Sequence, residues 1–67
     1  MAYLYIKRIK TDHSIALAGM LSFLFVFEEQ DTKDSRSVLV FLPYEYTQAQ
    51  IDERIFLLTT QINNGEL

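Results

Sequence analysis

The sequence contains no cysteine and no tryptophan, and only one histidine, one proline and two glycines among its 67 residues. The absence of cysteine excludes disulfides and cysteine-built zinc sites, which often stabilise chains this short. The two glycines, Gly19 and Gly65, are too far apart for a glycine-rich phosphate-binding loop. Because 49% of the residues are hydrophobic, a packed core has to supply the stability of a single small domain spanning residues 1–67.

The chain also lacks an excess of basic residues, with six Lys and Arg against nine Asp and Glu and a formal net charge of −3. This balance gives no reason to expect binding to nucleic acid or to an anionic membrane. An uncharged run ends at Phe27, but as a helix from Ser14 it would span about 21 Å of the ~30 Å hydrocarbon core. We therefore expect a soluble cytoplasmic protein, with a one-helix membrane peptide as the lesser alternative.

Three segments have the composition and period-two pattern of β-strands: Tyr3–Ile9, Leu21–Glu28 and Ser37–Leu42. The polar segment Gln30–Arg36 between the last two is typical of a turn, so these strands are expected to form an antiparallel hairpin. The segment Thr11–Met20 is ambiguous, because it is compatible with a short helix and with a bulged extension of a strand.

The last segment has the signals of a helix over Gln48–Ile62. Thr47 and Gln50 have the spacing of a capping box, Tyr46 precedes the cap as a hydrophobic staple requires, and Gly65 supplies a left-handed stop. The predicted fold class is therefore α+β: a three-stranded antiparallel sheet, made of the hairpin and the N-terminal strand, packed against one C-terminal helix.

Apolar side chains point in more directions than one copy of this fold can cover. The hairpin strands are apolar on both faces, and Phe56 and Leu57 lie outside the helical stripe that should cover the sheet. Because a single helix covers one face, we expect a homodimer or higher homo-oligomer. The alternative is that residues 11–20 fold back over the second face. The residues expected at the self-association surface are Phe23, Phe25, Phe27, Leu39, Phe41, Phe56 and Leu57.

The sequence contains no recognisable catalytic or metal-binding constellation. His13 is flanked by Asp12 and Ser14, but neighbours in sequence seldom point at one another as a catalytic triad requires. One histidine with scattered carboxylates does not make a transition-metal site either. We therefore expect no enzymatic activity, no catalytic residues, no metal and no cofactor.

An acidic cluster and a tyrosine pair indicate a surface for another protein. Acidic side chains can compete for a basic site on a partner, and tyrosine is enriched at interface hot spots. We expect a small acidic protein that binds and modulates or inhibits another macromolecule, in the manner of a phage-type viral inhibitor or an accessory subunit. The residues expected to contact this partner are Glu28, Glu29, Asp31, Asp34, Tyr44 and Tyr46.

The alternative function is an oligomeric small-ligand binder that sequesters a phosphorylated, nucleotide-like molecule. Basic side chains interleaved with tyrosine on the first strand could supply cations and ring faces to such a ligand. Strand alternation places Lys7 with Tyr3 and Tyr5 on one face, and Arg8 and Lys10 on the other. The ligand-binding residues in this alternative are Lys7, Arg8, Lys10 and Arg36.

Overall fold

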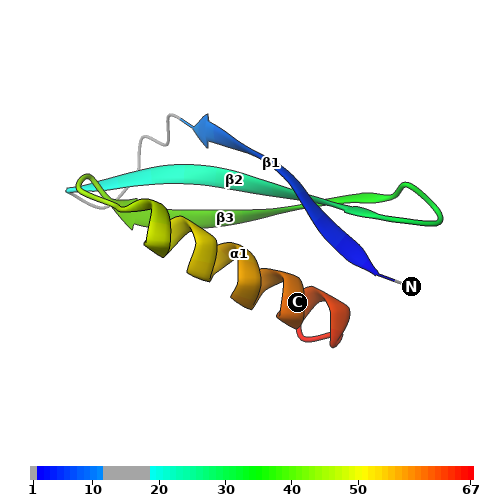
Figure 1. The fold of residues 1–67 in the computed structure, drawn as a ribbon. Helices are drawn as coiled ribbons and strands as arrows, with labels where there is room; N and C mark the ends of the chain where they lie inside the picture. Colours follow the sequence, from blue (N-terminus) through cyan, green and yellow to red (C-terminus); the bar gives the residue numbers. More distant parts are fainter. Residues whose placement is uncertain (1, 12–18) are drawn as a thin grey trace.

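Three antiparallel strands and one C-terminal helix make up the computed structural model, which describes residues 2–11 and 19–67 (Figure 1). In chain order the elements are β1 (Tyr3–Thr11), β2 (Met20–Glu29), β3 (Ser35–Pro43) and α1 (Gln48–Asn63). This arrangement confirms the predicted α+β fold. The sequence predicts that residues 11–20 form a short helix or a bulged strand, or that they cover the second face of the sheet. Residues 12–18 of this segment lie outside the described residues.

The strands form a meander in which β2 is central and both β1 and β3 are edges. The ladder between β1 and β2 shifts by one residue, because Tyr5 lies opposite Phe27 and Lys7 opposite Val26, which leaves Ile6 as a β-bulge. A bulge moves the following side chains to the other face. The sheet faces predicted for the β1 side chains after Ile6 are therefore wrong. Arg8 lies with Tyr5 on the same face as Phe27, and Lys7 lies on the opposite face.

The hairpin between β2 and β3 turns over residues 30–34, a shorter connection than predicted, because each strand extends further toward the turn. The Glu29 N–H donates to the Asp34 carbonyl at 2.8 Å, and the Lys33 N–H donates to the Glu29 carbonyl at 3.0 Å. Lys33 adopts a left-handed conformation with φ 66°, which reverses the chain direction. The turn places its acidic side chains at one end of the sheet.

Helix α1 begins and ends where its sequence signals predict. Thr47 and Gln50 form the capping box, in which the Thr47 N–H donates to Gln50 Oε1 at 2.8 Å and the Gln50 N–H donates to Thr47 Oγ1 at 3.3 Å. At the other end Gly65, with φ 75°, donates its N–H to the Ile62 carbonyl, and the next N–H reaches the Gln61 carbonyl. These two bonds are a Schellman motif, which uses the freedom of glycine at positive φ.

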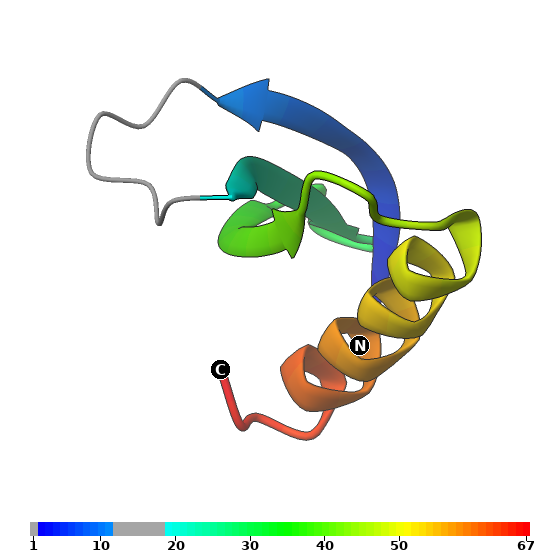
Figure 2. The same ribbon diagram turned by 90° about the vertical axis from the view of Figure 1, so that its left-hand side faces the viewer.

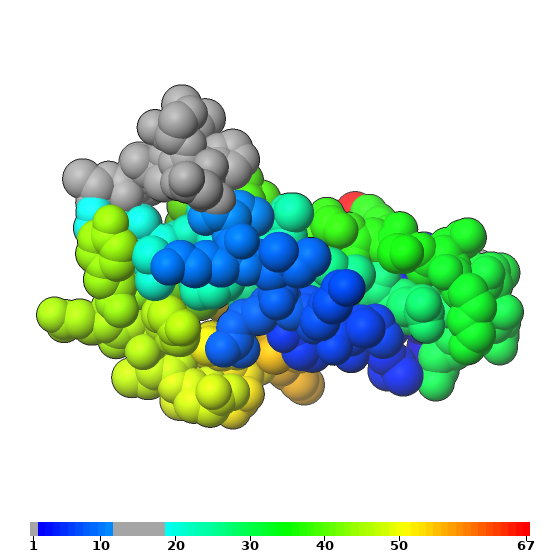
Figure 3. Space-filling model, turned by 90° about the horizontal axis from the view of Figure 1, so that it is seen from above, coloured from blue at the N-terminus to red at the C-terminus, as the bar shows by residue number. Residues whose placement is uncertain are grey.

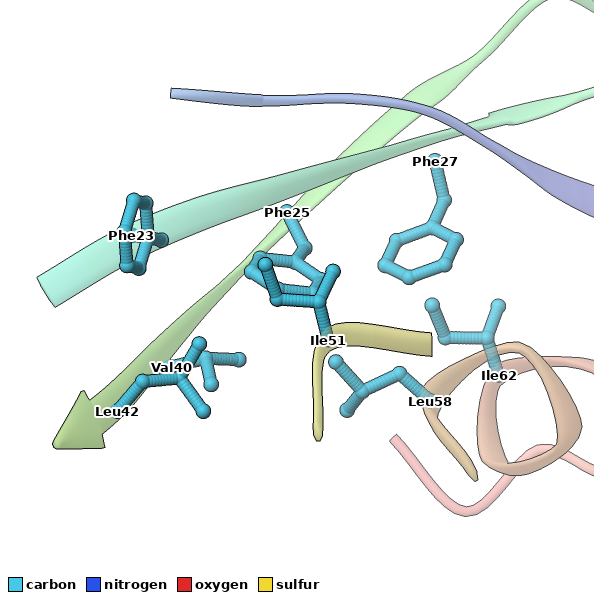
Figure 4. Packing of buried hydrophobic residues seen from close by; sticks show 8 residues of the cluster. All are labelled: Phe23, Phe25, Phe27, Val40, Leu42, Ile51, Leu58 and Ile62. Atoms are coloured by element: carbon cyan, nitrogen blue, oxygen red, sulfur yellow. The ribbon is translucent and has the colours of Figure 1, made fainter. Parts of the chain in front are cut away.

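The core lies between α1 and one face of the sheet. Figure 2 shows these as two layers, with α1 beside β1, and Figure 4 shows phenylalanine side chains of β2 pointing toward the helix. The buried residues of the core are Phe23, Phe25, Phe27, Val40, Leu42, Ile51, Leu58 and Ile62. Two rings bordering this core extend it: Tyr5 stands 5.8 Å from Phe25 between centroids, and Tyr46 stands 5.6 Å from Phe23.

The prediction that Phe23, Phe25 and Phe27 form a self-association surface is wrong, because all three are buried in the core of a single copy. Each phenylalanine buries a large apolar area, so packing on a face that carries three of them contributes strongly to stability. The apolar face that the helix leaves uncovered is the opposite one.

Truncation of Phe25 should lower the free energy of unfolding by about 3–5 kcal/mol, because Phe25→Ala leaves a cavity at the centre of this core. The control is Phe56→Ala on the outer side of α1, where 70% of the side chain is exposed, and it should change stability by about 0.5 kcal/mol or less. Urea unfolding of both variants at one low protein concentration measures the difference. Equal losses would contradict this placement of the core.

Candidate interaction surfaces

The face of the sheet away from α1 is apolar and accessible, and we call it the open face. Its cross-strand register places Ile9, Leu24 and Leu39 side by side in one row across all three strands. Ile9 is 44% exposed, Leu39 is 39% exposed, and Leu24 between them is half-buried. The open face is formed by Leu4, Ile9, Leu24, Val26, Leu39 and Phe41, and Figure 3 views the molecule from this side, with β1 across the middle.

Polar side chains border this apolar row on both sides. Lys7 and Glu28 lie on the open face at the turn-ward end, and a Thr11–Ser22 hydroxyl pair, 2.6 Å between oxygens, closes the other end. An apolar patch with a polar rim is typical of a protein-binding surface. Leu39 and Phe41, two of the predicted self-association residues, belong to this face.

A second apolar region lies between the end of β3 and the first half of α1. An open pocket of about 400 Å³ is lined by Leu42 and Pro43 from the strand end and by Leu57 from the helix, with Glu53 and Arg54 at its rim. The pocket lies on the β3 side because, among the described residues, α1 is bonded to β1 and not to β3. The Tyr3 N–H donates to Asn63 Oδ1 at 2.7 Å, and Asn63 Nδ2 donates to the Tyr3 carbonyl at 3.2 Å.

Phe56 and Leu57, the helical members of the predicted self-association set, are both exposed. Only Leu57 borders the pocket beside β3. Phe56 points away from the core on the outer side of the helix, as the helical projection predicted.

The predicted basic ligand set is not brought together in one copy of the chain. Arg8 lies with its guanidinium carbon 5.8 Å from the centroid of the Phe23 ring, and Arg36 lies 5.8 Å from that of Tyr3. Lys7 projects from the opposite face because of the bulge at Ile6. Lys10 follows Arg8 on the helix side of β1, opposite Phe23. The basic residues therefore border the sheet and do not converge on a common point.

In the acidic hairpin, Glu29 has a structural role that its sequence did not reveal. Its side chain is only 2% exposed, and its Oε2 accepts the N–H groups of Thr32 at 2.6 Å and Asp31 at 2.8 Å. Its Oε1 accepts the N–H of Ala2 at 3.2 Å, which ties the N-terminus to the turn. These bonds, the Thr32 N–H first among them, lower the pKa of Glu29 in spite of the opposing effect of burial.

The other predicted partner-binding residues divide between the two ends of the sheet. Asp31 and Asp34 are exposed in the hairpin turn, whereas Tyr44 is exposed in the loop between β3 and α1 at the far end. Tyr46 is half-buried and packs on Phe23 at the border of the core, so its ring is largely occupied by the fold. The acidic turn and Tyr44 lie at opposite ends of the sheet and do not form a single patch. A protein interface of ordinary size would therefore include one of them and not the other.

Among residues 2–11 and 19–67, no group of three or more histidine and acidic side chains is placed to hold a metal ion. His13 lies outside the described residues. Over the same part of the chain, no helix has the length and apolar character needed to cross a membrane.

No family model, curated protein or solved structure matches this chain. Sequence reasoning missed Leu4, Ile9 and Leu24 as members of the main apolar surface. The alternation of Leu24 and Val26 with the phenylalanines did show a second apolar face, but alternation alone does not tell which face the helix covers.

Replacement of Glu29 should make stability less dependent on pH. Because its pKa is lower in the folded chain, the carboxylate stabilises the fold above the unfolded-state pKa, and this contribution is lost as pH falls through the folded-state pKa. Glu29→Gln should therefore unfold at a lower temperature than the wild type at neutral pH, and the gap should close in strong acid. Thermal unfolding followed by circular dichroism across pH measures it.

The matched control is Glu28→Gln, since among the described residues no hydrogen bond is formed by the Glu28 carboxylate. This variant should follow the wild-type pH profile. A constant gap between Glu29→Gln and the wild type at all pH values would show that the carboxylate charge has no part in holding the turn.

Proposed function

We propose that this protein is a non-enzymatic interaction protein that works as a homo-oligomer and binds another macromolecule. One observation carries the proposal: the open face presents a continuous row of large aliphatic side chains, and the exposed Leu57 adds a second apolar region at the β3 side. Surfaces of this kind are usually covered by protein.

The energetic scale supports self-association. Fully burying one large apolar side chain is worth about 1.5–3 kcal/mol, so a few such side chains rival the ~5–15 kcal/mol net stability of a folded domain. A stable dimer of standard size buries about 600–1,000 Å² on each partner. The accessible surface of this chain is 4656 Å², so such a contact would take roughly a fifth of it or less.

The second macromolecule is proposed to meet the acidic hairpin turn. Asp31 and Asp34 are exposed there, while Glu29 is occupied by the turn itself. A compact acidic tip can compete for a basic site on another protein, and in this way the chain would inhibit or modulate its partner. The open face that remains free after self-association is available to the same partner.

The mass of the chain in solution should rise above 7.8 kDa with protein concentration, and the unfolding temperature should rise with it. Association stabilises the folded state by mass action, so the two measurements are linked. Sedimentation equilibrium and thermal unfolding over the micromolar range test this. A single-chain mass with a constant unfolding temperature would exclude self-association.

Reversal of one charge in the turn should slow binding to the partner recovered on immobilised wild-type protein. We expect Asp31→Lys to reduce the association rate and its salt dependence, because rim charges steer encounter. Glu45→Lys makes the same charge change at the far end of the sheet and should leave the rate near that of the wild type. Stopped-flow kinetics at several salt concentrations distinguish them, and equal rates would remove the turn from the contact.

A further inference from the structure

The two edges of the sheet differ in how well they are protected against pairing with another strand. The β1 edge carries Lys7, Arg8 and Lys10 and a bulge at Ile6, all of which are devices that prevent edge-to-edge association. The β3 edge has one charged residue, Arg36, and its ladder with β2 is regular from end to end. In the described sheet, β3 is therefore the edge open to a further strand.

The backbone groups of β3 that point outward can be assigned from the hydrogen bonds at both ends of its ladder. The Glu29 N–H bonds to the Asp34 carbonyl at 2.8 Å, and the Tyr44 N–H bonds to the Gly19 carbonyl at 3.1 Å. Since hydrogen-bonded pairs alternate along an antiparallel ladder, even-numbered residues of β3 face β2 and odd-numbered residues face outward. Pro43 occupies an outward position, where its missing N–H costs no ladder bond.

We propose that the β3 edge binds the β3 edge of a second copy, antiparallel and about a two-fold axis at Leu39, which joins two sheets into one of six strands. This inference rests on the proposed self-association and places it at the β3 edge, which leaves the open face accessible to the second macromolecule. In this register all nine residues of each β3 overlap, and Ser37 faces Phe41 of the second copy. Only the terminal pairs, in which Pro43 faces Ser35, lack one ladder bond each. The apolar row of Ile9, Leu24 and Leu39 then continues into the same row of the second copy.

The charges of the chain permit a second copy at β3 and oppose it at β1. With Leu39 on the axis, Arg36 faces Leu42 of the second copy, and the two Arg36 residues are about 20 Å apart along the strands, beyond the ~8–10 Å screening length. A two-fold pairing at the other edge would instead bring the basic residues of two β1 strands against each other. Like charges opposite one another destabilise a sheet.

The same arrangement leaves the helix layer intact. A two-fold axis perpendicular to the sheet keeps both α1 helices on one side of it, so the core around Phe25 is undisturbed. It also brings the second copy beside the pocket lined by Leu42 and Leu57, which adds apolar contact below the joined strands.

The test uses opposite charges at the proposed axis. Leu39→Lys and Leu39→Glu should each weaken dimerisation at least tenfold, because each places a like-charged pair across the axis. An equimolar mixture of the two should recover the dimer, since Lys then faces Glu at the same position. Sedimentation velocity measures both effects, with circular dichroism as a check that each variant retains the fold.

Two further variants separate edge pairing from packing between open faces. Ser37→Pro removes an outward N–H from the β3 edge without changing an apolar side chain, and it should weaken the dimer at least tenfold. Ile9→Lys adds a charge to the same open face at the opposite edge and should change the dissociation constant less than threefold.

If the wild type dimerises but Ile9→Lys weakens the dimer while Ser37→Pro does not, the faces pack together and the inference is overturned, although self-association stands. Failure of the Lys and Glu variants to form a mixed dimer would overturn the two-fold register at Leu39. A wild type that remains a single chain at every concentration would overturn both this inference and the proposed self-association.

Discussion

The apolar stripe of a single helix can be buried against only one face of a sheet, and the rest of this molecule follows from that limit. Ile51, Leu58 and Ile62 form the stripe, and they pack on the phenylalanine face of β2. The aliphatic row on the opposite face has no element of its own to cover it among the described residues. The chain thus combines a well-formed core with an apolar surface suited to a partner.

Local polar contacts take the place of the disulfides on which many short chains depend. Glu29 closes the hairpin turn and holds the N-terminus, while Asn63 ties the end of α1 to the start of β1. The capping box at Thr47 fixes the other end of the helix. Each contact lies at the end of a helix or strand, where backbone groups would otherwise lack hydrogen-bond partners. A few side chains therefore supply these partners at the ends of the elements.

Features decided by local signals could be predicted from the sequence, and features decided by pairing between strands could not. The helix start at Thr47 and its stop at Gly65 depend on neighbouring residues, and both were predicted. The bulge at Ile6 depends on how β1 meets β2, so its effect on Lys7 and the later basic residues was missed. The role of Glu29 was missed for a similar reason, because its partners come from the turn and the N-terminus.

Amide hydrogen exchange along β3 distinguishes a paired edge strand from an unpaired one. The inward N–H groups of Val38 and Val40 bond to β2 in one copy of the chain, whereas the outward N–H groups of Leu39 and Phe41 have a strand partner only in the paired sheet. Pairing of two β3 edges predicts that the outward amides become protected as protein concentration rises. Fast exchange of Leu39 and Phe41 at every concentration, beside slow exchange of Val38 and Val40, would contradict it.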